Sequence, residues 1–202
     1  MIEIQNIRKS FGDNILFNNY CLYIKKGEFV IISGESGSGK TTLLNMIGAL
    51  EKVDSGKILV NGIDIARRKN QLRYYRDTVG FLFQNFVLLE DKTVFQNLNI
   101  IQKQSQSGIT IEDALQKVGL EDKINSKVYT LSGGEQQRVA LARLIIKKCS
   151  LILADEPTGS LDRKNGEKVI TILEQMREEG RTVVLVTHND ELKKRGGRIV
   201  EL

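Results

Sequence analysis

Hydrophobic and polar positions change their spacing several times along the first part of the chain. Alternation over residues 2–7 and 15–24 predicts two strands, and a break over residues 25–27 separates them from a third strand over residues 28–33. Over residues 40–50, apolar residues recur at helical spacing instead. We therefore expect a β-rich beginning in which a strand passes, through a glycine-rich segment, into a helix.

Later apolar runs predict strands on either side of a helical stretch. Residues 151–154 and 182–186 are short and mostly apolar, which is typical of buried parallel strands, whereas residues 95–118 show helical patches and polar breaks. A mostly helical insert is thus expected to interrupt an α/β core. The predicted boundaries are a core of residues 1–84 and 130–202 and a helical subdomain of residues 85–129, within one domain of residues 1–202.

Composition narrows the class of protein. Hydrophobic residues make up 41% of the 202 residues and charged residues 27%, the balance of a soluble globular domain. The longest apolar runs are strand-sized and the N-terminal segment does not resemble a signal peptide, so we expect a cytosolic chain without a membrane span. The formal charge of +5 comes from scattered basic groups, and only 6% of residues are aromatic. No nucleic-acid partner is therefore expected.

The strongest chemical signal is the sequence GESGSGKT at residues 34–41, between a predicted strand and a predicted helix. Its glycines let successive backbone N–H groups converge on phosphate oxygens at the positive end of the helix. Lys40 adds a cation for the β- and γ-phosphates, the Thr41 hydroxyl is placed to bind Mg²⁺, and Thr42 can reach the α-phosphate. A glycine-rich turn that only caps a helix is the alternative. The predicted binding residues are Gly34, Glu35, Ser36, Gly37, Ser38, Gly39, Lys40, Thr41 and Thr42.

Two carboxylates follow the apolar run at residues 151–154. Asp155 is predicted to help hold Mg²⁺, and Glu156 to orient and deprotonate an attacking water. This division of roles indicates hydrolysis, which the glycine-rich loop alone does not separate from kinase chemistry. The alternative is an exposed acidic turn before Pro157.

A further motif, LSGGEQQR, occupies residues 131–138 ahead of an apolar helical face. Ser132 is a good N-cap, and the glycines that follow allow close backbone approach to an anion. A capped helix without a ligand and a second anion-binding site are equally compatible with these residues. The candidate binding residues here are Ser132, Gly133, Gly134 and Glu135.

The segments GESGSGKTT, LSGGEQQR and LILADEPTGSLD and the late Thr187-His188 occur in an order that resembles the ATP-binding subunits of ATP-binding cassette (ABC) transporters. The sequence around these motifs is similar to that of the lipoprotein-release, macrolide-export and peptide-antibiotic-export branch of the family. The resemblance implies a P-loop NTPase core with a mostly parallel sheet, an N-terminal antiparallel β subdomain and a helical insert. It also implies an ATPase that uses ATP and Mg²⁺, and a head-to-tail homodimer in which LSGGE of one subunit binds the γ-phosphate held by the other.

Four further positions take roles from the same resemblance. Gln84 corresponds to a glutamine that senses Mg²⁺ or the attacking water, and His188 to a histidine that touches the γ-phosphate. Phe11 corresponds to the aromatic that stacks on adenine, and the segment Ser160-Leu161-Asp162 to a loop that crosses the dimer interface. By themselves these side chains could be a surface glutamine, an ordinary histidine at a strand end and a core phenylalanine.

The resemblance also implies a partner, a transmembrane permease subunit, and a peripheral location on the cytoplasmic face of the plasma membrane. The apolar residues available to grip that partner are Phe86, Leu88, Leu89, Val94 and Phe95, which could equally be internal core. The predicted function is to power an exporter or a mechanotransmission complex whose substrate is a peptide, lipoprotein or antibiotic. The alternatives are a soluble cassette ATPase acting on nucleic acid or ribosomes, which only the basic charge favours, and a small-molecule kinase, which has no use for LSGGE.

Overall fold

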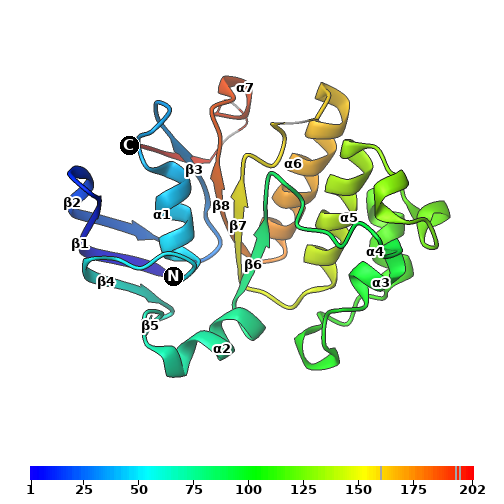
Figure 1. Cartoon of the computed structure of the whole chain (residues 1–202), viewed down its shortest axis with the longest axis horizontal. Coiled ribbons are helices and arrows are strands. Elements are labelled where there is room, and N and C mark those ends of the chain that lie inside the picture. The colour runs from blue at the N-terminus through cyan, green and yellow to red at the C-terminus, as the bar shows by residue number, and fades with distance from the viewer. Residues whose placement is uncertain (160, 194, 196) are drawn as a thin grey trace.

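A computed structural model describes residues 1–159, 161–193, 195 and 197–202. Its helices lie between and beside two sheets (Figure 1). The strands are β1 (Ile2–Phe11), β2 (Asn14–Ile24), β3 (Phe29–Ser33), β4 (Ser55–Val60), β5 (Ile63–Asp64), β6 (Val79–Leu82), β7 (Leu151–Asp155), β8 (Thr182–Val186) and β9 (Arg198–Glu201). The α-helices are α1 (Lys40–Ile47), α2 (Arg68–Asp77), α3 (Val94–Leu98), α4 (Ile111–Val118), α5 (Gly133–Ile146), α6 (Arg163–Glu178) and α7 (Asp190–Lys193).

The two sheets differ in direction and in burial. The first is antiparallel, with the order β2-β1-β4-β5, and the second is parallel, with the order β6-β7-β8-β3-β9. Every residue of β8 is buried, as expected for a parallel strand covered on both faces. This arrangement confirms the predicted fold class, although the boundaries of the helical subdomain stay a prediction.

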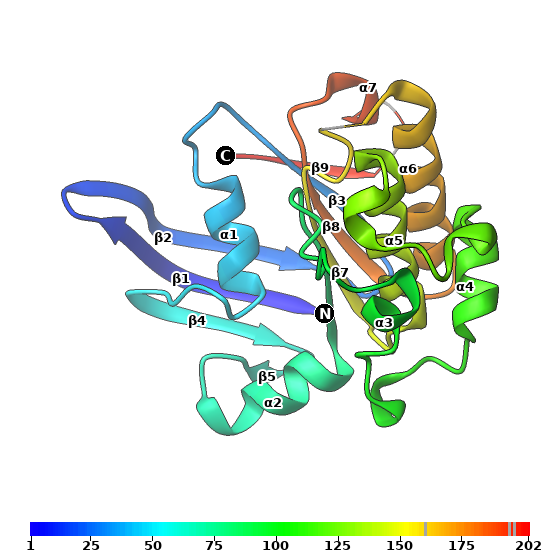
Figure 2. The same cartoon turned by 45° about the vertical axis from the view of Figure 1, so that its right-hand side comes forward.

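Successive residues of the parallel strands face two separate apolar cores. On β3, Val30 and Ile32 join a core that contains α1 and the antiparallel sheet, while Ile31 joins a core that contains α3, α4, α5 and α6. This alternation follows from the period of two along a strand. The layers are therefore the antiparallel sheet, α1, the parallel sheet and the helices α3, α4, α5 and α6, as Figure 2 shows from the side.

Local signals begin and end the helices. Thr93 accepts a hydrogen bond from Gln96 N at the start of α3, and Thr110 accepts one from Asp113 N at the start of α4. The predicted helix over residues 40–50 ends earlier, at Ile47, because Gly48 closes it as the C-cap. Val94 is fully buried, so the expectation that it is available to grip a partner is wrong. Within the described ranges, no helix combines the length and apolarity that a bilayer span requires.

Gly56 on β4 provides a test of the antiparallel sheet. Its φ is +86°, and a Cβ built on it would lie 2.5 Å from Asn6 O. We expect Gly56→Ala to lower the free energy of unfolding by about 3 kcal/mol, since the backbone strain and the clash with β1 add. Gly62→Ala is the matched control, because its φ is +74° but a Cβ there would have no neighbour within 4 Å.

Urea unfolding of both glycine variants measures the difference. The Gly62 variant should lose only about 1 kcal/mol, the cost of the left-handed backbone alone. Equal losses for the two variants would contradict the close approach of β4 to β1.

Candidate functional site

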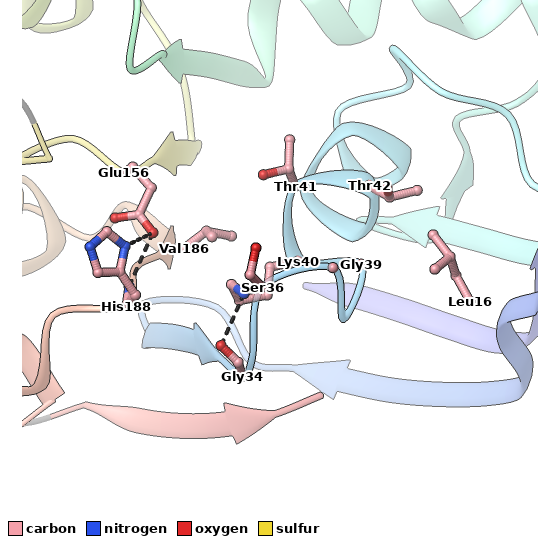
Figure 3. Close-up of a pocket in the computed structure, with 11 residues that line it drawn as sticks. Leu16, Gly34, Ser36, Gly39, Lys40, Thr41, Thr42, Glu156, Val186 and His188 are labelled. Carbon is pink, nitrogen blue, oxygen red and sulfur yellow. Dashed lines mark hydrogen bonds and ion pairs between the residues drawn. The ribbon is translucent and has the colours of Figure 1, made fainter. Parts of the chain in front are cut away.

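A pocket of about 360 Å³ opens where α1 begins beside the carboxyl ends of β3, β7 and β8 (Figure 3). Ligands of open α/β sheets bind at this edge, because the strand ends and helix N-termini converge there. The pocket therefore combines backbone donors, a helix N-terminus and polar side chains. Its lining residues are Leu16, Gly34, Ser36, Gly37, Gly39, Lys40, Thr41, Thr42, Glu156, Val186 and His188.

The glycine-rich loop takes a backbone course that other residues resist. Gly34 has φ +150°, and a Cβ there would lie 2.6 Å from Leu202 O and 2.8 Å from Ser38 Oγ. Lys40 Nζ donates to Gly34 O at 3.0 Å and to Glu35 O at 2.6 Å, so the cation lies over the loop itself. The Ser38 hydroxyl is buried without a hydrogen-bond partner. The loop thus presents a cation and backbone donors to one small volume.

Thr41 and Asp155 connect the loop to the end of β7. The Thr41 hydroxyl donates to Asp155 Oδ1 at 3.1 Å. Burial raises the pKa of the Asp155 carboxyl and the neighbouring Glu156 raises it further, while the Thr41 hydrogen bond and Lys40 lower it. A carboxylate that burial and a second carboxylate destabilise is one that a bound cation would stabilise.

Glu156 is held in a fixed orientation just after β7. Its Oε1 accepts from His188 N at 3.0 Å and lies 2.7 Å from His188 Nδ1 (Figure 3). Its Oε2 accepts from Thr187 Oγ1 at 3.2 Å. The backbone of Glu156 has φ +43°, and its N–H donates to Val186 O at 3.0 Å. A left-handed backbone at a non-glycine residue is strained, and the neighbouring strand end holds it in place.

The residues after β8 thus orient the carboxylate that follows β7. The sequence singles out His188 as a contact of the nucleotide, but not as a partner of Glu156. The hydrogen bond from Thr187 to Glu156 could not be predicted, because the sequence shows only that a hydroxyl precedes the histidine.

The hairpin of β1 and β2 borders the loop. The pairs Lys9↔Phe17 and Ser10↔Ile15 leave Leu16 as an extra residue in β2, and this bulge turns Leu16 into the pocket. Three consecutive apolar residues in a strand, at positions 15–17, are the signal that could have indicated it. Phe11 ends β1 with 51% of its surface exposed, so the core-packing alternative is wrong. Phe11 does not line the pocket itself.

Gln84 lies outside the pocket lining but near Glu156. A Cβ built on Gly159 would lie 3.5 Å from Gln84 Nε2 and 3.6 Å from Glu156 Cβ, so the two side chains flank the same turn. The loop after Gln84 is fixed from α5, where Arg143 Nη1 donates to Val87 O at 2.5 Å and Nη2 to Phe86 O at 2.9 Å. The position of Gln84 is therefore coupled to the helix that LSGGE begins.

The LSGGE residues lie apart from this pocket, at the start of α5. Ser132 Oγ accepts from Glu135 N at 3.3 Å, and Glu135 Oε2 accepts from Ser132 N at 2.8 Å, which is a capping box. The Ser132 backbone hydrogen bond lowers the pKa of the Glu135 carboxyl. The predicted N-cap of α5 is therefore observed. Space for a ligand remains beside Gly133, because a Cβ built there would lie 3.9 Å from its nearest neighbour, Phe86 Cζ.

The segment after Glu156 is fixed at both ends by α5 and α6. Gln137 Nε2 donates to Pro157 O at 2.8 Å, and Asp162 Oδ1 accepts from Asn165 N at 3.0 Å as the N-cap of α6. The hydrogen bonds from Asn165 lower the pKa of the Asp162 carboxyl. Asp162 lies outside the pocket, and Ser160, expected at a dimer interface, lies outside the described residues.

These contacts suit a nucleotide and a hard cation. A Cβ built on Gly37 would meet nothing within 4 Å, so the loop leaves room for phosphate. The Lys40 ammonium donates to two carbonyl oxygens that a phosphate can replace. Hydroxyl and carboxylate oxygens at Thr41 and Asp155 are the donor type that Mg²⁺ prefers. Fold and site together define a P-loop nucleotide-binding protein.

Comparisons with known proteins identify the particular family. Residues 17–159 match the ABC transporter family. The ABC transporter ATP-binding protein YvrO of Bacillus subtilis, described as uncharacterized, is 37% identical over 214 residues, which cover 99% of this chain and 92% of the relative. The chain therefore belongs to the ABC transporter family, as one of its ATP-binding and ATP-hydrolysing cassettes.

A further relative and two solved structures are consistent with this family assignment. The macrolide export ATP-binding/permease protein MacB of Campylobacter jejuni is 41% identical over 212 residues, 100% of this chain and 33% of the relative, so the chain spans about a third of that protein. A dimeric structure of the ATP-binding cassette MJ0796 in a post-hydrolysis state with ADP and Pi has a TM-score of 0.86 at 38% identity. A second dimeric MJ0796 structure has a TM-score of 0.88 at 39% identity. Each covers 100% of this chain and 94% of the other.

Proposed function

We propose that this cassette hydrolyses Mg·ATP at a site shared between two copies of the chain, and that it thereby powers a membrane exporter or mechanotransmission complex. The observation that carries the proposal is the separation of two groups of residues. Lys40, Thr41, Asp155 and Glu156 meet around one pocket, whereas the LSGGE residues begin a helix elsewhere. A second chain is needed to bring them to the same phosphate.

Each residue has a proposed role in binding. The backbone of residues 34–39 holds the phosphates, Lys40 compensates charge on the β- and γ-phosphates, and exposed Phe11 stacks on adenine. Thr41, Asp155 and Gln84 would hold Mg²⁺, directly or through water. The ion would neutralise charge on the β- and γ-phosphate oxygens.

The proposed chemistry centres on Glu156. Because Thr187 and His188 fix its carboxylate, Glu156 can take a proton from a water that attacks the γ-phosphate. His188 also lines the pocket and can contact the γ-phosphate. The dimer would be head-to-tail, with Ser132, Gly133, Gly134 and Glu135 of the partner completing the site and Asp162 at the interface. The dimeric state of the MJ0796 structures supports this arrangement.

A second groove, of about 330 Å³, supports a transmembrane permease as partner. It lies beside β6 at the edge of the parallel sheet and is mostly apolar, with Arg143 and Lys147 among its lining residues. None of the apolar residues expected to grip the partner lines it. The groove is lined by Tyr75, Val79, Phe81, Phe83, Val87, Ile100, Ile101, Arg143, Leu144 and Lys147.

The location follows from such a partner: the cassette would lie on the cytoplasmic face of the plasma membrane as a peripheral subunit. The name of the MacB relatives supports export, and a peptide, lipoprotein or antibiotic is the proposed substrate class.

A pair of isoleucine variants tests the partner. Ile100, which is 53% exposed in the groove, is changed to Glu, and Ile199, which is 42% exposed on β9 at the opposite edge of the sheet, is changed to Glu as the control. We expect Ile100→Glu to reduce recovery of one transmembrane protein with the tagged chain by about tenfold, because a buried charge opposes apolar docking. Its basal ATPase rate should stay close to that of Ile199→Glu.

The measurement is quantitative mass spectrometry of the tagged chain purified from membranes, together with phosphate release by the isolated chain. Equal recovery with both variants would contradict docking at the groove. Salt-sensitive binding to RNA without any transmembrane protein would favour the nucleic-acid alternative instead.

A further inference from the structure

Lys9 stands out among the lysines that the structure describes, because it alone is buried, with 6% of its surface exposed. Lysine is seldom buried unless it is paired. Lys9 lies on β1 two residues before Phe11, so both side chains leave the same face of the strand. A buried cation beside the residue proposed to bind adenine requires an explanation.

Two carboxylates hold the Lys9 ammonium. Its Nζ donates to Glu51 Oε1 at 2.7 Å and lies 3.6 Å from Asp54 Oδ1. Asp54 also fixes the intervening residue, because Ser10 N and Ser10 Oγ donate to Asp54 Oδ2 at 2.8 and 2.9 Å. The hydrogen bond with Glu51 raises the pKa of Lys9 and lowers that of Glu51, so both stay charged at neutral pH. The end of β1 is therefore tied to the segment between α1 and β4.

The same ammonium lies over the Phe11 ring, 4.6 Å from its centroid. This distance is within the range of a cation–π interaction. The cation covers one face of the ring, and 51% of the surface of Phe11 remains exposed and so accessible to a ligand. The contact with the cation therefore restricts the rotamer of a half-exposed side chain.

We propose that Lys9, held by Glu51 and Asp54, is a positioning residue that sets the Phe11 ring for stacking on the adenine of the nucleotide. The inference rests on the proposed function, in which Phe11 binds the base. Lys9 acts in two ways. It restricts the ring before the ligand arrives, which lowers the entropic cost of binding. It also draws electron density from the ring, which reduces repulsion between the two π-faces.

The test compares two ligands of the full chain, Mg·ATP and Mg·tripolyphosphate, of which only ATP carries a base. The variants are Lys9→Met, which removes the charge and keeps the length, Lys9→Arg, which keeps the charge, and Phe11→Ala. Lys57→Met, on the exposed part of β4, is the control. Calorimetric titration gives the dissociation constants, and circular dichroism verifies folding.

We expect Lys9→Met to weaken ATP binding about three- to tenfold, the size of a cation–π contribution. Its affinity for tripolyphosphate should change by less than about twofold, as for a surface substitution. Lys9→Arg should bind ATP nearly as well as the unmodified chain, and Phe11→Ala should show a larger ATP-selective loss. If Lys9→Met does not fold, Asp54→Asn is expected to show the same selective loss, because it removes one of the two carboxylate charges that hold the Lys9 ammonium.

The other possible outcomes of these titrations would contradict the inference, each in a different way. If Lys9→Met, or Asp54→Asn in its place, weakened the binding of ATP and of tripolyphosphate equally, Lys9 and its carboxylate partners would stabilise the fold and would not position the Phe11 ring. An unchanged affinity for ATP in that variant, with a selective loss in Phe11→Ala, would overturn the inference alone. No selective loss in Phe11→Ala would overturn both the inference and the proposed adenine contact.

Discussion

Replacing Glu156 with glutamine is expected to lower the steady-state rate of ATP hydrolysis by about 10²- to 10³-fold while ATP binding is retained. Glutamine has nearly the same shape. Its Oε1 can still accept from His188 N and its Nε2 can donate to Thr187 Oγ1, the two groups that contact Glu156 at 3.0 and 3.2 Å. It cannot take a proton from water. Phosphate release at saturating Mg·ATP measures the loss, and gel filtration with ATP should show more dimer, since ATP is no longer consumed.

The control for this variant is Glu201→Gln, the same substitution at an exposed position of β9. Its hydrolysis rate should stay within about twofold of the unmodified chain. Hydrolysis at a normal rate by Glu156→Gln would show that another group takes the proton, and the assignment of Glu156 as base would be wrong.

Elements governed by local sequence rules were predictable. The alternation over residues 2–7 and 15–24, the glycine-rich loop before α1 and the two apolar runs that form β7 and β8 all appear in the structure. The capping of α5 by Ser132 was also foreseen, because an N-cap needs only its own next turn. Each of these signals lies within about one turn of helix or one strand.

Contacts between distant segments were not predictable in the same way. Leu16 reaches the pocket through a bulge that depends on the register of β1 against β2. Lys9 meets Glu51 across 42 positions of the sequence, and Thr187 meets Glu156 across 31. Spacing along the chain carries no information on such pairs, since the topology of the sheets brings them together. The groove beside β6 had no sequence signal for the same reason, because segments before, within and after the predicted helical insert form it.

Two inactive variants mixed together are expected to recover hydrolysis, because the proposed site draws residues from both subunits. Lys40→Met removes the cation that compensates the phosphates, and about 100-fold lower activity is expected from the loss of a charge-assisted contact. Gly133→Asp places a carboxylate where LSGGE meets the partner's γ-phosphate, and a similar loss is expected. The aspartate should not disturb folding, since a Cβ there has open space and an acidic residue suits a helix N-terminus.

In a mixed dimer, the Gly133 variant supplies an intact phosphate loop and the Lys40 variant an intact LSGGE, so one of the two sites is complete. A random equal mixture contains complete sites at roughly a quarter of the normal number, and hydrolysis should return toward that fraction. Different affinity tags on the two variants, purified in sequence after exchange with ATP, isolate the mixed dimer for the assay. A mixed dimer that forms but stays inactive would contradict the shared site. If the site lay within one chain, every chain in the mixture would carry a damaged one, so recovered activity can come only from residues contributed across the interface.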